Sequence, residues 1–198
     1  GDEAGTAITT GDNNVAVGYA SGDAITTGVS NTAIGSLSLS AATTANSNTV
    51  VGKSAGTAIT TGSDNVAMGS VALTTNTTGA SNVAIGRSAL RYNTTASNNT
   101  AVGYASLGAN TTGTDNVAVG ANALDANTTA SNNTAVGDNA LGANTTGTGN
   151  SALGADALDA NTTGDSNLAL GKSALSSNTT ASLNTAVGVA AMEANTTG

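Results

Sequence analysis

Four side chains in one part of the sequence have the chemistry of a binding contact. Arg87, Arg91, Tyr92 and Tyr104 include two of the four cations and two of the three tyrosines of the chain. Arginine and tyrosine are enriched among residues that dominate the binding energy of interfaces. Arg87 and Tyr104 are 17 residues apart, which is the repeat period of this chain, so they are expected to stack as a cation–π pair. We take the four as candidate contacts for a surface ligand, with ordinary surface variation as the alternative.

Residues suited to catalysis or metal binding are scarce. The chain has no histidine and no cysteine. Its twelve acidic residues fall mostly at variable positions, so no paired general acid and base recurs in register. Asp64 and Asp115, in TGSDN and TGTDN, are three repeats apart, whereas calcium-binding β-rolls need such residues in successive coils. We therefore predict no catalytic, cofactor or metal site, and no enzyme.

Composition and charge exclude other classes. The net charge is −8, and nucleic-acid binding requires clustered cations, so no nucleic-acid partner is expected. No apolar run approaches the roughly 18 residues of a membrane helix, so no membrane insertion is expected. Aromatic residues make up 2% of the chain, which leaves material only for a thin core. Because the first residue is not methionine, we expect a segment of a longer fibrous protein.

A 17-residue repeat organises residues 1–198 into a single array without insertion or deletion. Counted from the asparagine that begins each copy, the consensus is N-[TV]-A-[VI]-G-x-x-A-L-x-A-N-T-T-[GA]-x-x, with glycine at position five. Arrays of this regularity build solenoids, in which each repeat is one coil stacked on the last, so twelve coils are predicted. The position-five glycines are Gly1, Gly18, Gly35, Gly52, Gly69, Gly86, Gly103, Gly120, Gly137, Gly154, Gly171 and Gly188.

The coil is predicted to be β rather than α. Apolar residues at positions two and four alternate with position three, and a period of two indicates a strand. We expect one strand at positions one to five, a second near positions eight to thirteen, and turns at six to seven and fifteen to seventeen. Glycine at position five is never replaced, which indicates a positive φ or a close backbone approach.

Positions nine and twelve are expected to reach the same core. Most copies have leucine at nine and asparagine at twelve, but three early copies have glycine at nine and isoleucine at twelve, so one branched side chain per coil fills the core. The exchanged pairs are Gly5 with Ile8, Gly22 with Ile25, and Gly56 with Ile59. In the coil beginning at Asn99, we expect Val102 and Leu107 to fill the core and Gly103 to turn the chain.

Asparagine and threonine columns are expected to be structural. Asn99, Asn110, Thr111 and Thr112 should align with their copies in neighbouring coils and hydrogen-bond from coil to coil. The NTT triplets also match the N-glycosylation acceptor, but their strict periodicity gives a sufficient structural reason. The Thr-Thr pairs run from Thr9 to Thr197 and suggest an ice-binding array as a rival; only one column can point outward, however, because adjacent strand residues face opposite sides.

The strand is apolar on both faces, since position three is alanine in ten of eleven copies while positions two and four are also apolar. Such strands are normally buried on both faces, and one thin coil covers only one of them. We therefore predict self-association, with a homotrimer as the preferred closure.

The repeat resembles the SVAIG-type repeats of YadA-like head domains in trimeric autotransporter adhesins. The N-[TV]-A-[VI]-G…A-L pattern carries the resemblance, and AGTAITTG at 4–11 and 55–62 is similar to their A-x-A-x-G half. The longer form, NTAVG-x-x-AL-x-x-NTTG, resembles repeat regions of phage tail-fibre proteins. The resemblance covers the whole chain and implies a homotrimer of left-handed parallel β-rolls with the position-two and position-four side chains inside. Adhesin-head repeats are usually shorter, so the extra residues here must enlarge a turn.

These observations predict an all-β parallel β-solenoid that is a structural, non-enzymatic segment of a trimeric fibre or adhesin. It would extend a shaft and present surface turns to a host-surface glycan or receptor, on a virion fibre or a bacterial cell surface, and thus outside the cell. The last copy stops at Gly198, in mid-repeat. The alternative function is an ice-binding solenoid that uses the stacked threonine columns.

Overall fold

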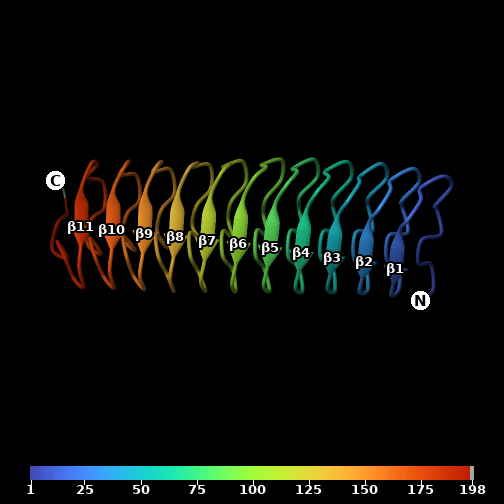
Figure 1. Cartoon of the computed structure of the whole chain (residues 1–198), viewed down its shortest axis with the longest axis horizontal. Helices are drawn as coiled ribbons and strands as arrows, with labels where there is room; N and C mark the ends of the chain where they lie inside the picture. The colour runs from blue at the N-terminus through green and yellow to red at the C-terminus, as the bar shows by residue number, and fades with distance from the viewer. Residues whose placement is uncertain (197–198) are drawn as a thin grey trace.

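The computed structural model describes residues 1–196, and they form an all-β solenoid with one short strand per repeat. Thr197 and Gly198, at positions fourteen and fifteen of the last copy, lie outside the described residues. The described strands form one parallel sheet in chain order along the length of the molecule (Figure 1). They are β1 (Val15–Val17), β2 (Thr32–Ile34), β3 (Thr49–Val51), β4 (Val66–Met68), β5 (Val83–Ile85), β6 (Thr100–Val102), β7 (Val117–Val119), β8 (Thr134–Val136), β9 (Ser151–Leu153), β10 (Leu168–Leu170) and β11 (Thr185–Val187).

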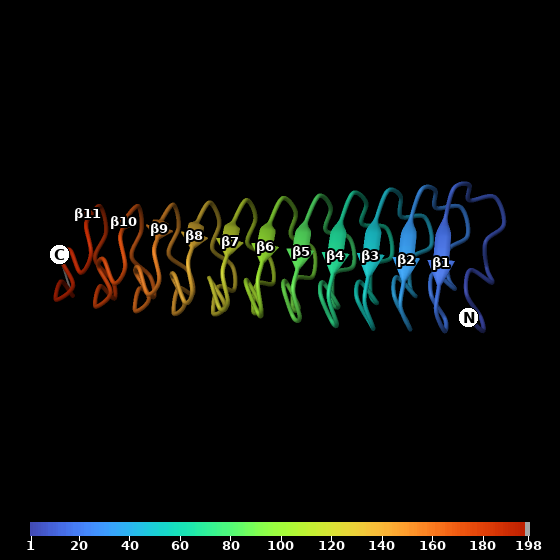
Figure 2. The ribbon, with the colours of Figure 1, turned by 60° about the horizontal axis from the view of Figure 1, so that its bottom comes forward.

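Every strand pairs in register with the strand one repeat away. In β6 and β7, for example, Thr100 pairs with Val117 and Val102 with Val119. Because no residue is inserted or deleted, each side chain lies about 4.8 Å from its copy in the next coil, the usual spacing of paired strands. Figure 2 shows that the rest of each coil returns to the next strand through irregular chain. The predicted parallel solenoid with a 17-residue spacing is confirmed.

The strand occupies positions two to four, and the second predicted strand is wrong. Positions eight to thirteen form successive turns, because the residues at positions seven and nine have positive φ, as in Ala105 (54°) and Leu107 (49°). The amide of Leu107 donates to the carbonyl of Ala123 in the next coil at 2.9 Å, whereas that of Gly108 donates back to Ala105 at 3.0 Å. Hydrogen bonds to the next coil thus alternate with local turn bonds, and the chain bends at each local bond instead of extending as a strand.

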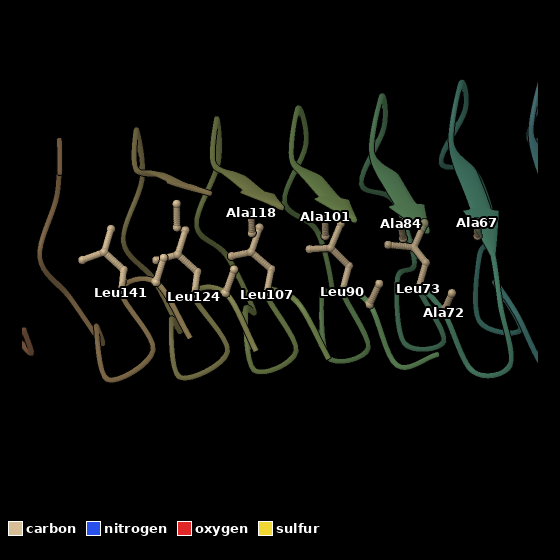
Figure 3. Packing of buried hydrophobic residues seen from close by; sticks show 14 of the residues in the cluster. Ala67, Ala72, Leu73, Ala84, Leu90, Ala101, Leu107, Ala118, Leu124 and Leu141 are labelled. Atoms are coloured by element: carbon tan, nitrogen blue, oxygen red, sulfur yellow. The ribbon is translucent and has the colours of Figure 1, made fainter. Parts of the chain in front are cut away.

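The core lies between the sheet and these turns, and it is thin. Figure 3 shows leucines from the turn segment lying against alanines from the strands. Ala101 and Leu107 are fully buried, but Val102 is only partly buried. The prediction that positions two and four point inward is therefore wrong: position three does. The reason is space, since the turn segment lies so close behind the sheet that a methyl group and one leucine fill the gap.

The exchange of positions nine and twelve is confirmed. Ile25 and Ile59 belong to the same buried cluster as the leucines of the later coils. The Cδ1 atom of Ile59 lies 2.9 Å from where a Cβ on Gly56 would stand, so the two positions compete for one volume. Val50, the only residue other than alanine at position three, places its two methyl groups 3.3 and 3.4 Å from that same point and helps to fill it.

The glycine at position five has both of the features that were predicted as alternatives, a positive φ and a close backbone approach. Gly103 has a φ of 139°, outside the range of ordinary side-chain-bearing residues. A Cβ on Gly103 would lie 2.6 Å from the carbonyl carbon of Gly120 and still nearer to its oxygen. No side chain fits here without separating two coils, which explains why the position never varies.

Candidate functional site

Two buried asparagine columns join the coils. At position one, the amide and Nδ2 of Asn116 donate to Oδ1 of Asn99 at 3.1 and 3.2 Å, and Nδ2 also donates to the carbonyl of Ala130 at 2.9 Å. At position twelve, Nδ2 of Asn127 donates to Oδ1 of Asn110 at 2.9 Å and to the carbonyl of Ala130 at 3.1 Å. A buried polar group is costly unless it is hydrogen-bonded, and these groups are. The predicted coil-to-coil hydrogen bonding is confirmed.

The position-twelve asparagine column gives a structural reason for the NTT triplets, since each triplet begins with one of its asparagines. From Asn76 to Asn178, every asparagine at position twelve is fully buried. The Nδ2 atom, to which a glycan would be joined, already donates to a carbonyl three residues on, as in Asn110 to Gly113 at 2.9 Å. In the folded chain these triplets are structural and closed to modification.

The threonine pairs form a hydrogen-bonded column at position thirteen and an exposed outer column at position fourteen. At position thirteen the hydroxyl donates to the backbone of the next coil, as from Thr111 to the carbonyl of Thr128 at 2.9 Å. The same bond recurs from Thr9 to Thr179. At position fourteen the threonines are exposed, as in Thr112. The position-fourteen column is exposed and the position-thirteen hydroxyls stabilise the stack, although the pair lies in a bend and not in the strand from which one outward column was predicted.

The arginine and tyrosine candidates form two cation–π pairs. The guanidinium of Arg87 lies 6.0 Å from the ring centroid of Tyr104 in the next coil, which confirms the predicted stacking. Arg91 lies 5.0 Å from the ring of its neighbour Tyr92, a pair that the repeat spacing did not indicate. All four side chains are exposed, and Tyr92 and Tyr104 retain 48% and 53% of their full exposure. Arg87 and Arg91 therefore each present an exposed guanidinium group next to a tyrosine ring, on a chain whose net charge is −8.

The outer side of the sheet is a continuous apolar surface, which we call the strand face. It consists of the first and third residues of strands β1 to β11, which point away from the core because the second residue points into it. The third residue is valine, isoleucine, leucine or methionine in every strand, and the first is valine, leucine, threonine or serine. Val17, Met68 and Leu153 are exposed by 53%, 42% and 49%. The sequence indicated two apolar sides, but it did not show which of them faces solvent.

The described residues contain no enclosed pocket and no group of three or more acidic residues placed to hold a metal ion. Among these residues no helix is long and apolar enough to cross a membrane.

Two aspartates at position ten are partly withdrawn from water. Burial raises the pKa of Asp125, and burial together with the nearby Asp156 carboxylate raises the pKa of Asp159. Oδ1 of Asp159 is buried without a hydrogen-bond partner. Asp125 and Asp159 are two coils apart, and Gly142 occupies position ten of the coil between them. Their carboxyl groups therefore do not form a paired acid–base site.

Comparison with known proteins identifies no family. No protein-family model, curated protein or solved structure matches this chain.

Proposed function

We propose that this chain is a structural, non-enzymatic segment of a fibre or adhesin, a left-handed roll that assembles as a homotrimer on a virion fibre or a bacterial surface. The uninterrupted stack of coils carries the proposal. Backbone hydrogen bonds, the position-one Asn column and the position-thirteen threonines join successive described coils, and the position-twelve Asn column adds to them from Asn76 onward. A chain that commits so many of its polar groups to axial hydrogen bonds is suited to a stiff shaft.

The proposed mechanism is mechanical and multivalent. Eleven strands spaced by about 4.8 Å extend about 50 Å along the axis. Positions six and ten vary freely from coil to coil, so they can change the surface without changing the shaft. Three parallel copies would present each surface turn three times, which raises the overall avidity for a repetitive cell surface.

Arg87, Arg91, Tyr92 and Tyr104 are the proposed contact with a host-surface glycan or receptor. Two exposed guanidinium groups held over aromatic rings suit an acidic sugar, because the rings stack on the sugar while the guanidinium groups bind its carboxylate.

An array of neutral, sialylated and uronic-acid oligosaccharides tests this contact. We expect binding to acidic members and at least a tenfold loss of affinity in the Arg87→Ala/Arg91→Ala variant. Lys53→Ala, which removes a cation at position six in another coil, serves as the control and should bind normally. Equal binding by the double variant and the parent chain would exclude these residues as the contact.

The alternative function, ice binding, is favoured by one observation. The outer Thr column is exposed and regular along the axis, with Thr95, Thr112 and Thr129 in successive coils. Thermal hysteresis measured at high protein concentration tests it. Ice binding requires hysteresis that falls when Thr112 and Thr129 are both changed to Lys, whereas no hysteresis in the parent chain would exclude it.

A further inference from the structure

The strand face is larger than a solitary protein usually leaves exposed. Twenty-two side chains, two from each strand, lie side by side on it. Sixteen of them are aliphatic, and if each of these presents on the order of 50 Å², the apolar part of the face is about 800 Å², against roughly 300–600 Å² for the largest apolar patch of a typical monomer and about 800 Å² per partner in a stable interface. A surface of this size and character indicates a partner.

The distribution of charge sets this face apart from the rest of the surface. All sixteen acidic and basic residues lie at positions six, seven, ten, sixteen and seventeen of the repeat, and none lies on the strand face. A net charge of −8 is thus kept on the turns, where copies placed side by side would leave it in solvent. The face itself offers no charge to a charged partner, but its composition suits another surface like itself.

The spacing of the face favours a second copy of this chain as that partner. Side chains repeat along it about every 4.8 Å without a break, so they form ridges with a fixed period. A copy has the same period and fits those ridges over the whole length, whereas a globular partner would match only a few coils. Aliphatic third residues in every strand give one unbroken column for the closest packing.

We infer that the strand face is the interface between copies, with the chains parallel and in register and the third-residue column nearest the symmetry axis. This inference rests on the self-association in the proposed function, and it identifies the surface that carries it. Cyclic three-fold symmetry about an axis along the rod keeps identical coils at the same level. Ile34 of one chain would then face Ile34 of the next, and Leu170 would face Leu170.

Single cysteines test both the surface and the register, because the chain has no cysteine of its own. Ile34→Cys and Leu170→Cys lie near opposite ends of the face, and Thr44→Cys lies on the outer Thr column. Treated with a short bis-maleimide, Ile34→Cys and Leu170→Cys should each cross-link to their own copies, and Thr44→Cys should not. In a second measurement, Val102→Lys should reduce the mass in solution about threefold, while Thr112→Lys should leave it unchanged.

The outcomes separate this inference from the proposal beneath it. A parent chain that is monomeric by light scattering overturns the proposed assembly and the inference together. A trimeric parent whose Thr44→Cys variant cross-links while Ile34→Cys does not overturns the inference alone. Cross-linking that requires mixing Ile34→Cys with Leu170→Cys would indicate antiparallel chains and overturn the in-register arrangement. Circular dichroism of Val102→Lys confirms that the lysine separates folded chains.

Discussion

Gly103 has only hydrogen where other residues have a Cβ, and this allows its Cα to lie close to the backbone of the next coil. An added methyl group would meet the Gly120 carbonyl, and the φ of 139° would be strained for any other residue. We predict that Gly103→Ala lowers the free energy of unfolding by about 2–4 kcal/mol, measured by urea denaturation. Gly149→Asn is the control, because its φ of 67° matches that of Asn98 and Asn132 at the same position. A control as damaging as Gly103→Ala would contradict this explanation.

Burial disfavours the ionised form of Asp159, as it does for Asp125, and the nearby Asp156 carboxylate adds to the effect. The raised pKa of Asp159 means that the folded chain favours the protonated carboxyl, so the stability associated with this group is present at low pH and is lost as the pH rises through the folded pKa. Asp159→Asn should therefore raise the melting temperature at pH 7, and the gain should shrink as the pH falls through the raised pKa of the folded chain and be absent below the ordinary value of 3.8. Asp138→Asn, at an exposed site, should show no such gain. A gain that stays constant from pH 7 to pH 3 would contradict the assignment.

At the scale of the element, the coil has two interchangeable cores. The early form combines Gly56, Ile59 and Val50, and the later form combines alanine, leucine and asparagine at the corresponding positions. Gly56→Leu alone should collide with Ile59 and Val50, and Ile59→Asn alone should leave a void, each destabilising the chain by about 2–4 kcal/mol.

The triple variant Val50→Ala/Gly56→Leu/Ile59→Asn should recover stability to within about 1 kcal/mol of the parent, because it recreates the later core and gives Asn76 a partner in the preceding coil. Thermal and urea unfolding of all three variants measure this coupling. Strictly additive losses would show that the two cores are not alternatives.

The 17-residue spacing made part of this structure predictable. The parallel stack, the Asn columns and the contact between Arg87 and Tyr104 depend only on which residues lie one period apart, so they followed from the sequence. Which side of the strand is buried did not follow from the sequence, because the alternation of side chains separates position three from positions two and four without indicating which of them points into the core. The turn at positions eight to thirteen was also missed, since Leu107 adopts a positive φ that leucine usually avoids. The burial of Asp159 arises from the course of that turn.

At the scale of the whole molecule, the strand face links the fold to its proposed use. A separate chain would expose this apolar surface along its full length, whereas three chains would enclose it and leave a net charge of −24 (3 × −8) on the outer turns. The fibre would then be stiffened twice, by hydrogen bonds along each chain and by apolar packing between chains. Surface turns could differ from coil to coil without disturbing either.

Light scattering coupled to size-exclusion chromatography measures the number of chains in the assembled molecule. If the chain forms a trimeric shaft, the measured mass will be three times the 18.6 kDa of one chain and will stay constant on dilution. A folded species of 18.6 kDa that persists at high concentration would exclude the trimeric shaft.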